Sequence, residues 1–207
     1  MSNDDFLLLI LSSPSGAGKT TLKSRILNES HPELRFSVSH TTRKPRATEQ
    51  DGREYHFIDK ARFMKMANAG EFAEWAEVHG NLYGTSLHEI EAAKQSHRGV
   101  VFDIDHQGAR QIKATMPDAI SVFILPPSMQ ELERRLRSRA SDDEQTVQRR
   151  LLAARSEIGH YAFFDYLVVN DDLEEAHRKL DAIVVAERAN RARNARAAEH
   201  LLSKGQV

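Results

Sequence analysis

The sequence predicts an α/β protein with a parallel central sheet. Four short, almost continuously apolar runs occur along the chain, and each is followed by a segment with the pattern of a helix. Continuous apolar runs are typical of strands that are buried on both faces, as in a parallel sheet covered by helices. A chain of 207 residues is long enough for one such domain, with room for an insertion.

The expected elements can be placed by residue number. The strands cover residues 6–11, 99–105, 120–125 and 166–170. The helices after them run from 20 to about 29, from 107 to about 115, from 128 to about 139, and from about 173 past 193. Ser128 with Glu131 forms a capping-box pattern, and Ser86 with Glu89 forms another before a helix toward 96. Beyond 188 the chain is rich in Arg and Ala, as in a solvated terminal helix.

Two segments interrupt this alternation of strands and helices. Residues 36 to 96 contain a proline and four glycines among short strand-like pieces, so we interpret them as an inserted mixed α+β lobe. The core of the single predicted domain then covers about 1–35 and 97–207. Residues 138 to about 145 are polar and charged, which indicates a surface loop or lid within a helical region of about 135–155.

The composition excludes several classes of protein. Lys and Arg total 29 against 30 Asp and Glu, whereas a dedicated nucleic-acid binder usually has a basic excess. Because there is no cysteine, disulfides and thiolate metal sites are excluded and a reducing compartment is favoured. The run at 6–11 is too short to span a bilayer and follows two acidic residues, unlike a signal peptide. We expect a cytoplasmic protein with neither nucleic-acid nor membrane partners. The sequence leaves open whether it forms a homo-oligomer.

A phosphate-binding loop is predicted at residues 13–20, which read Ser-Pro-Ser-Gly-Ala-Gly-Lys-Thr between the first strand and the first helix. Backbone N–H groups in such a loop surround phosphate oxygens, and Gly16 and Gly18 allow the close approach. Lys19 would reach the β- and γ-phosphates, and Thr20 would bind Mg²⁺. Ser13 departs from the glycine usual at the first position. The alternative is a glycine-rich turn with a solvated lysine, which the position between strand and helix disfavours.

A carboxylate that serves the metal is expected at the end of an apolar strand. Asp103 and Asp105 stand two residues apart at the end of the 99–105 strand, so their side chains share one face of it. The alternative is that one of them only caps the following helix.

A second set of phosphate donors lies in the inserted segment. Ser39, Arg43, Arg46 and Tyr55 offer a hydroxyl, two guanidinium groups and a phenol, and Tyr83 precedes Gly84 in a tight loop. The two arginines are three residues apart and can converge on one dianion. The alternative is a basic turn in solvent.

With these motifs, the chain resembles the guanylate kinase family from residue 7 to about 188. The resemblance is carried by residues 12–20, 37–46, 52–55, 74–85 and 103–108, of which 37–46 is the most diagnostic. It implies a P-loop kinase fold with a parallel core sheet flanked by helices, an inserted GMP-binding lobe and a short helical lid. The implied reaction is reversible transfer of the γ-phosphoryl group of ATP to GMP, with Mg²⁺ as the cofactor that accompanies ATP.

The resemblance also implies a role for each matching residue. The ATP-binding residues are Ser13, Pro14, Ser15, Gly16, Ala17, Gly18, Lys19, Thr20, Arg135, Asn170 and Asp171. The GMP-phosphate residues are Ser39, Arg43, Arg46, Tyr55 and Tyr83, and the guanine residues are Glu74, Thr85 and Asp103. The catalytic charges are Lys19, Arg46, Arg139 and Arg150, and the metal is held by Thr20 and, through water, by Asp105. The lid arginine departs from the family pattern, because Ser138 and Ala140 flank it where glycines are usual.

Two other functions stay open at this stage. A P-loop kinase for a ribose bisphosphate would not need a carboxylate that recognises guanine, so Glu74 and Asp103 argue against it. A catalytically inactive relative that binds proteins would lose its phosphate loop, whereas Lys19 and Thr20 are intact here. Glu74 could instead pair with a cation of the inserted segment. Phe72 and Trp75 are interpreted as core residues of that segment.

Overall fold

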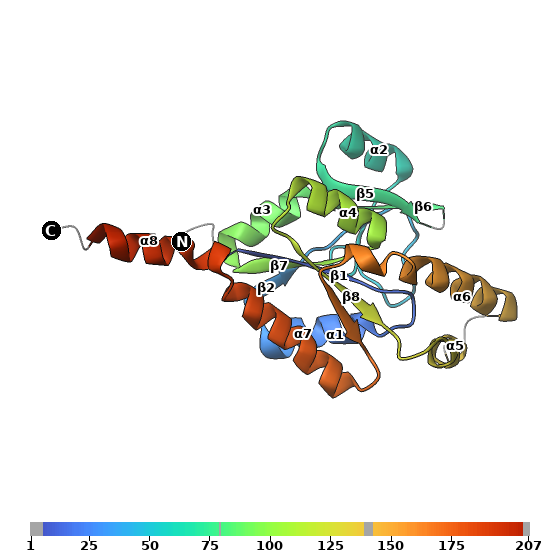
Figure 1. Ribbon diagram of the computed structural model, residues 1–207. Coiled ribbons are helices and arrows are strands. Elements are labelled where there is room, and N and C mark those ends of the chain that lie inside the picture. Colours follow the sequence, from blue (N-terminus) through green and yellow to red (C-terminus); the bar gives the residue numbers. More distant parts are fainter. Residues whose placement is uncertain (1–5, 79, 139–142, 205–207) are drawn as a thin grey trace.

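The central sheet contains the four predicted strands and one more (Figure 1). The computed structural model describes residues 6–78, 80–138 and 143–204. Its strands lie in the order β2-β7-β1-β8-β9, and every neighbouring pair is parallel. They are β1 (Leu7–Ser12), β2 (Leu34–Phe36), β7 (Gly99–Asp103), β8 (Ile120–Leu125) and β9 (Tyr166–Val169). The α/β fold class is therefore confirmed, with β2 as the strand that sequence patterns missed.

The continuous apolar run of β1 is explained by helices on both faces of the sheet. Leu7, Leu9 and Leu11 belong to a core cluster with α1 (Lys19–Arg25) and α7 (Leu173–Arg188). Ile10 points to the opposite cluster, which includes α3 (Leu87–Ser96) and α4 (His106–Thr115). In Figure 1, α1 and α7 lie below the sheet, and α3 and α4 lie above it. Alternate residues of one strand thus fill two different cores.

The helix caps differ in part from the predicted patterns. In α5 (Met129–Arg137), the Ser128 hydroxyl accepts the Glu131 N–H at 3.0 Å, as expected. The Glu131 carboxylate does not return this bond, because it accepts hydrogen bonds from Arg134 and Arg135. Ser86 precedes α3 as predicted but makes no side-chain cap, and Glu89 turns to Arg35 instead. The helix positions were thus predicted correctly while the capping boxes were not.

Two predicted helices are interrupted. The first ends as an α-helix at Arg25 and continues as a π-helical turn, η2 (Ile26–Ser30). The last one breaks into α7 and α8 (Arg191–Lys204). Asn190 explains this break, because its side-chain oxygen accepts the Ala192 N–H at 3.0 Å and starts a new helix. Figure 1 shows that α8 extends away from the sheet, as a solvated terminal helix would.

A second, smaller sheet is formed within the segment predicted as an insertion. Its strands are β3 (His40–Thr41), β4 (His56–Phe57), β5 (Phe72–Val78) and β6 (Asn81–Ser86), in the order β4-β3-β6-β5. Pairing is parallel between β3 and β4 and antiparallel elsewhere. Phe63 of α2 (Lys60–Asn68) is fully buried and stacks on the partly buried Phe72 at 4.6 Å, so Phe72 packs on the interior of this lobe. Trp75 contacts Phe63 edge-on but is 38% exposed, so the prediction that it is a core residue is wrong.

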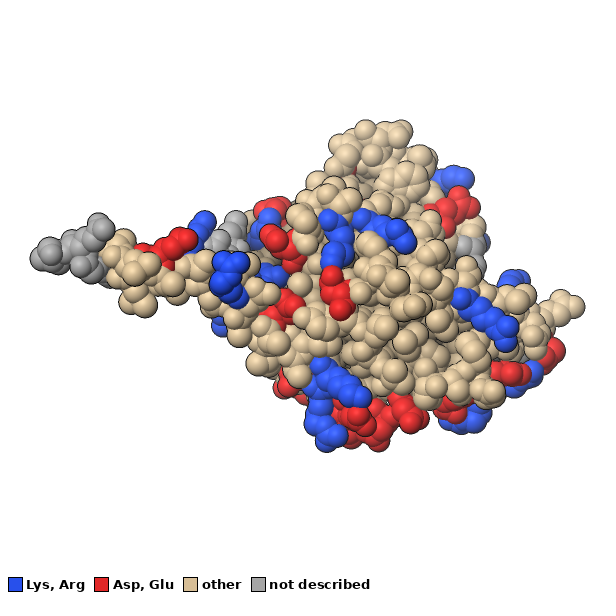
Figure 2. Space-filling view, viewed as in Figure 1, with Lys and Arg blue, Asp and Glu red and all other residues tan. Residues whose placement is uncertain are grey.

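The surface carries both signs of charge in close proximity. On the face seen in Figure 2, basic and acidic side chains are interspersed. Ion pairs such as Arg25–Glu174 at 2.6 Å and Lys113–Asp165 at 2.6 Å account for part of this mixture. Among residues 6–78, 80–138 and 143–204, no helix has the length and apolar character to cross a membrane.

Candidate active site

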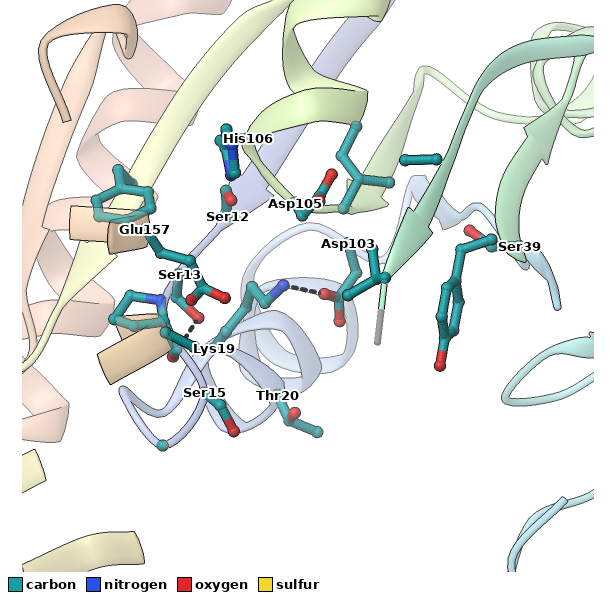
Figure 3. A pocket seen from close by; sticks show the side chains of 18 of the residues that line it. Ser12, Ser13, Ser15, Lys19, Thr20, Ser39, Asp103, Asp105, His106 and Glu157 are labelled. Carbon is teal, nitrogen blue, oxygen red and sulfur yellow. Dashed lines mark hydrogen bonds and ion pairs between the residues drawn. The ribbon is translucent and has the colours of Figure 1, made fainter. Parts of the chain in front are cut away.

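A pocket with a cavity volume of about 430 Å³ lies at the carboxyl ends of β1 and β7. One wall is the loop between β1 and α1, the opposite wall is the second sheet, and a third comes from α6 (Glu144–Ile158). Open α/β sheets bind their ligands at this end of the strands. Figure 3 shows polar side chains from these elements pointing into the same space.

The phosphate-binding loop has the geometry that its glycines predict. Gly16 and Gly18 have φ values of 96° and 95°, which side chains disfavour, and Gly18 caps α1. Seven of the eight loop residues line the pocket; Ala17 is buried behind it. The Asn170 amide donates to the Ala17 carbonyl at 2.7 Å and is only 5% exposed. Asn170, assigned to the ATP site by resemblance, therefore packs behind the loop rather than lining the pocket.

Two lysines share the Asp103 carboxylate at the centre of the pocket. Lys19 pairs with one oxygen, and Lys23 contacts the other at 2.9 Å (Figure 3 shows the first pair). Burial would raise the pKa of Asp103, but the two ammonium groups outweigh burial and hold this pKa at about 2. Asp103 is thus ionised at neutral pH. Lys23 was not predicted, although its position four residues after Lys19 places both on one side of α1.

Asp105 caps a helix and also borders the pocket. Its Oδ1 accepts the backbone N–H of Gly108 at 2.9 Å and that of Gln107 at 3.1 Å, so Asp105 does cap the helix, although capping is not its whole environment. Its Oδ2 accepts a hydrogen bond from the exposed Gln107 amide at 3.2 Å. Mg²⁺ prefers oxygen ligands and keeps several waters, so Thr20 and the Oδ2 of Asp105 are donors of the right kind. Within the described ranges, no cluster of three or more His, Asp or Glu side chains offers an alternative metal site.

The opposite wall is formed by side chains of the second sheet and of residues just before its strands β3 and β4. Ser39, Tyr55 and Tyr83 line the pocket, and the two tyrosine rings meet edge-on at 5.8 Å. Burial raises the pKa of Tyr55 to about 12, and the nearby Asp103 charge adds to the shift. The phenol therefore stays protonated and can donate a hydrogen bond to an anion.

Glu74 is the buried carboxylate of this wall. It lies opposite Thr85 in the pairing of β5 with β6 and is 4% exposed. Burial raises the pKa of Glu74 to about 7; a hydrogen bond from Thr85 opposes this shift and the Asp105 charge adds to it. Within the described parts of the chain no Lys, Arg or His contributes to this pKa shift, so nothing there supports the alternative that Glu74 pairs with a cation. Thr85 is fully buried and braces Glu74 rather than lining the pocket.

The two predicted phosphate arginines lie differently. Arg43 donates to Glu49 at 2.9 Å and to the Lys44 carbonyl at 2.7 Å, beside the Tyr55 ring, and does not line the pocket. The Arg46 side chain does line the pocket but is 72% exposed. Glu49 also accepts the Arg46 backbone N–H at 2.8 Å, so one unpredicted carboxylate organises the loop that holds both arginines.

The third wall contains Arg150 and Glu157 of α6. Burial raises the pKa of Glu157 to about 6, the Lys19 charge lowers it, and the Ser15 N–H donates to it. Figure 3 shows Glu157 near the phosphate loop. Sequence reasoning missed Glu157, although it follows Arg150 by two helical turns.

The remaining assigned residues lie outside the pocket lining or outside the described residues. Arg135 donates to Glu131 at 2.7 Å and to the Asn170 carbonyl at 3.1 Å, and Asp171 is exposed in the turn after β9. Neither lines the pocket. Arg139, the predicted lid arginine, lies outside the described residues.

A parallel sheet whose first strand enters a Gly-Lys-Thr phosphate loop, facing a wall that carries Ser39, Tyr55 and Arg46, is the arrangement of a P-loop kinase. Comparison with known proteins gives the family. The guanylate kinase family model matches residues 7–187. The chain therefore belongs to the guanylate kinase family.

Individual relatives agree with this assignment. A guanylate kinase of Myxococcus xanthus is 53% identical over 188 residues, which cover 90% of each chain. One of Aromatoleum aromaticum is 51% identical over 188 residues, covering 91% of this chain and 90% of the relative. The crystal structure of guanylate kinase from Anaplasma phagocytophilum superposes with a TM-score of 0.75 at 35% identity, covering 91% of this chain and 89% of that one.

Proposed function

We propose that the pocket between the two sheets is the active site of this guanylate kinase, with ATP on the β1–α1 loop and GMP against the second sheet. The enzyme transfers the γ-phosphoryl group of ATP to GMP and so produces ADP and GDP. One observation carries the proposal: a single cavity joins Lys19 and Thr20 of the loop to Glu74 of the second sheet and to Ser39 just before β3. Direct transfer requires both phosphates in one space that excludes water.

Lys19 binds the β- and γ-phosphates in this proposal, while backbone N–H groups of the loop surround the β-phosphate. To do so, Lys19 must leave Asp103. Lys23 stays within 2.9 Å of the second Asp103 oxygen, so the half-buried carboxylate keeps a cation throughout the exchange. The ion pair therefore keeps Lys19 in the pocket before ATP binds. When Lys19 leaves Asp103, Lys23 still neutralises this carboxylate.

Thr20 and Asp105 would hold the metal that accompanies ATP, Asp105 through water. Mg²⁺, when bound, neutralises charge on the phosphates that the two residues face. The cap that Asp105 makes on α4 fixes the position of its carboxylate relative to the loop. Rigid placement of this kind is what lets a single oxygen orient a hydrated ion.

The GMP phosphate binds to Ser39, Tyr55, Tyr83 and Arg46 in this proposal. Arg43 joins them from its position at 5.4 Å over the Tyr55 ring, where Glu49 now holds it. Guanine binds to Glu74, which Thr85 braces, with Asp103 nearby. An ionised Glu74 accepts hydrogen bonds and therefore fits the N1–H and N2–H₂ edge of guanine, whereas adenine presents an acceptor at N1.

The reaction needs no strong general base. The second pKa of a phosphate monoester is near 6, so the GMP oxygen that attacks is largely deprotonated at pH 7. The free energy to be overcome is that of bringing two polyanions together, and catalysis is therefore positioning and charge neutralisation. Lys19, Arg46 and Arg150 supply positive charge from three sides, and Arg139 adds to it from the predicted lid.

A coupled assay of ADP release with each of the four ribonucleoside monophosphates tests the proposal. We expect turnover with GMP and a preference over AMP of roughly 10⁴ in kcat/KM, as for other sites built on substrate hydrogen bonds. Equal use of AMP and GMP would contradict the role of Glu74. Turnover only with a ribose bisphosphate, or binding of a phosphopeptide without any turnover, would favour the two alternatives instead.

The setting of the reaction is proposed from composition. We infer a cytoplasmic enzyme of purine nucleotide metabolism that recycles GMP and takes no nucleic acid as a partner. The near balance of charges and the absence of cysteine support this setting.

A further inference from the structure

Gly108 is a buried glycine in the first turn of α4, where the backbone does not require one. The φ angle of Gly108 is not positive, so any residue could adopt this backbone conformation. Glycine is among the least favourable residues within a helix, because it loses the most backbone freedom. A packing reason is therefore needed to explain why this position lacks a side chain.

The space beside Gly108 is filled by the Glu74 carboxylate. A Cβ atom at position 108 would lie 2.5 Å from Oε2 of Glu74 and 3.1 Å from its Cδ. The next atom, Cβ of Ile104, would be at an ordinary 3.4 Å. A methyl group at 108 would therefore displace one specific group, the carboxylate assigned above to guanine.

The backbones around this contact cannot easily separate. Gln111 follows Gly108 by one helical turn, and its side-chain amide makes two hydrogen bonds to Trp75, the residue after Glu74. Its oxygen accepts the Trp75 N–H at 3.1 Å, and its nitrogen donates to the Trp75 carbonyl at 2.8 Å. This amide clamp holds α4 and β5 together, so the strain of an added methyl group would fall on the flexible Glu74 side chain.

We propose that Gly108 is a specificity-determining position. Because Gly108 has no side chain, the Glu74 carboxylate occupies the space beside it, and the Gln111 clamp fixes the spacing between α4 and β5. Together they orient the carboxylate toward the guanine edge. This inference rests on the proposed role of Glu74 in base recognition. Gly108 is a positioning residue, because it acts through Glu74 and not on the substrate. Its N–H also donates to Asp105, so α4 connects the base-binding carboxylate to the metal side of the pocket.

The test is Gly108→Ala, with KM measured for GMP and ATP and with AMP as the competing acceptor. A shift of about 1 Å in a positioned group can cost about 10²-fold, so we expect KM for GMP to rise 10- to 100-fold. The GMP-over-AMP ratio should narrow, while KM for ATP stays within about twofold. Gln111→Ala should cause a smaller change of the same kind. Gly159→Ala is the matched control, because its added Cβ would meet only backbone oxygens of its own helix end.

A double-mutant cycle separates this role from a merely structural one. In a Glu74→Ala background the carboxylate is gone, so Gly108→Ala should no longer affect KM for GMP and should raise the melting temperature relative to Glu74→Ala alone. An equal loss of GMP affinity in both backgrounds, or an equal rise in KM for ATP, would overturn the inference. The melting temperatures decide the question even if Gly108→Ala alone folds poorly.

Failure of the inference can be told apart from failure of the proposed function. If Glu74→Ala abolishes the preference for GMP but Gly108→Ala leaves it intact, only the inference is wrong. If Glu74→Ala itself leaves the preference unchanged, the proposed role of Glu74 is wrong and the inference falls with it.

Discussion

Two carboxylates line the same pocket and have opposite pKa shifts. Burial favours the protonated form of each, yet the pKa of Asp103 is held at about 2 and that of Glu74 is raised to about 7. The difference lies in their neighbours: Lys19 and Lys23 flank Asp103, whereas Glu74 has Thr85 and the like charge of Asp105. Cations, rather than depth in the protein, decide which carboxylate is permanently charged.

The two ends of the pocket are also built differently. The end proposed to bind ATP is one contiguous loop on a sheet with helices on both faces, and the groups proposed to bind the phosphates there are mostly backbone N–H groups. The GMP end is assembled from side chains on the short strands and loops of the second sheet. The ATP end is therefore fixed by one loop conformation, while the GMP end depends on packing contacts such as that between Gly108 and Glu74.

The largest effect is expected at the ATP end. Lys19→Met removes a charge that neutralises the transition state, so kcat should fall by about 10²–10⁴, as on loss of a group that stabilises an oxyanion. GMP affinity should change little, because the proposed binding site of the acceptor is on the other sheet. Steady-state kinetics with GMP titrations measures both effects. Turnover within a few-fold of the parent would show that the loop does not act as a P-loop.

Arg150, on the wall formed by α6, is expected to affect kcat and not the stability of the fold. Arg150→Ala should lower kcat by about 10²-fold, because it removes one of the charges facing the phosphates. The melting temperature should stay nearly unchanged, since ion pairs at the surface contribute little stability. The same result is expected for Arg139→Ala. A variant that melts far lower with normal kcat would identify that arginine as structural.

The GMP end is expected to determine the choice of base. Glu74→Gln replaces an acceptor-only carboxylate with an amide that can donate to adenine N1. We expect kcat/KM for GMP to fall. The fall should correspond to a loss of about 1.5–3 kcal/mol in transition-state binding, which is the range for hydrogen bonds to charged groups. The GMP-over-AMP ratio should narrow, which kinetics with both nucleotides measures. A parallel fall for both nucleotides, with an unchanged ratio, would assign Glu74 a structural role only.

The features that sequence predicted well are local ones. The strands around β1 and the loop at 13–20 could be located because continuous apolar runs and a glycine-rich turn depend on neighbouring residues. β2 was missed because three residues, Leu34–Phe36, carry no pattern of their own and are strands only through pairing with β7. The break between α7 and α8 depends on one Asn190 cap within an otherwise helical run.

The types of residue expected at the site could be predicted from the sequence. The burial and the hydrogen-bond partners of each residue could not. Lys23 and Glu157 have a helical spacing from Lys19 and Arg150 that could have revealed them. Glu49 lies in a loop without periodicity, and no sequence signal connects it to Arg43. The packing of Asn170 behind Ala17 likewise joins residues 153 positions apart. The burial that raises the pKa of Glu74 comes from the packing of α4 against β5 in the folded protein.

The smallest expected effect, and the most direct test of the contrast between the two carboxylates, is the pH dependence of GMP use. In the proposed function Glu74 binds guanine in its ionised form, and burial raises its pKa to about 7 before the nucleotide binds. As pH falls through 7 the carboxyl takes up a proton, so kcat/KM for GMP should drop, by about tenfold at pH 6 relative to its plateau at high pH, because this parameter reports the free enzyme.

Other groups titrate nearby and must be separated from this effect. Glu157 has a pKa of about 6, and the second pKa of the GMP phosphate is also near 6. Both remain in Glu74→Gln, whose profile should therefore keep the inflection near 6 and lose the one near 7. Asp103, with a pKa of about 2, stays charged across this whole range and adds no inflection. If Glu74→Gln keeps the parent profile unchanged, Glu74 is not the group that titrates, and the proposed contrast between a permanently charged and a switchable carboxylate is wrong.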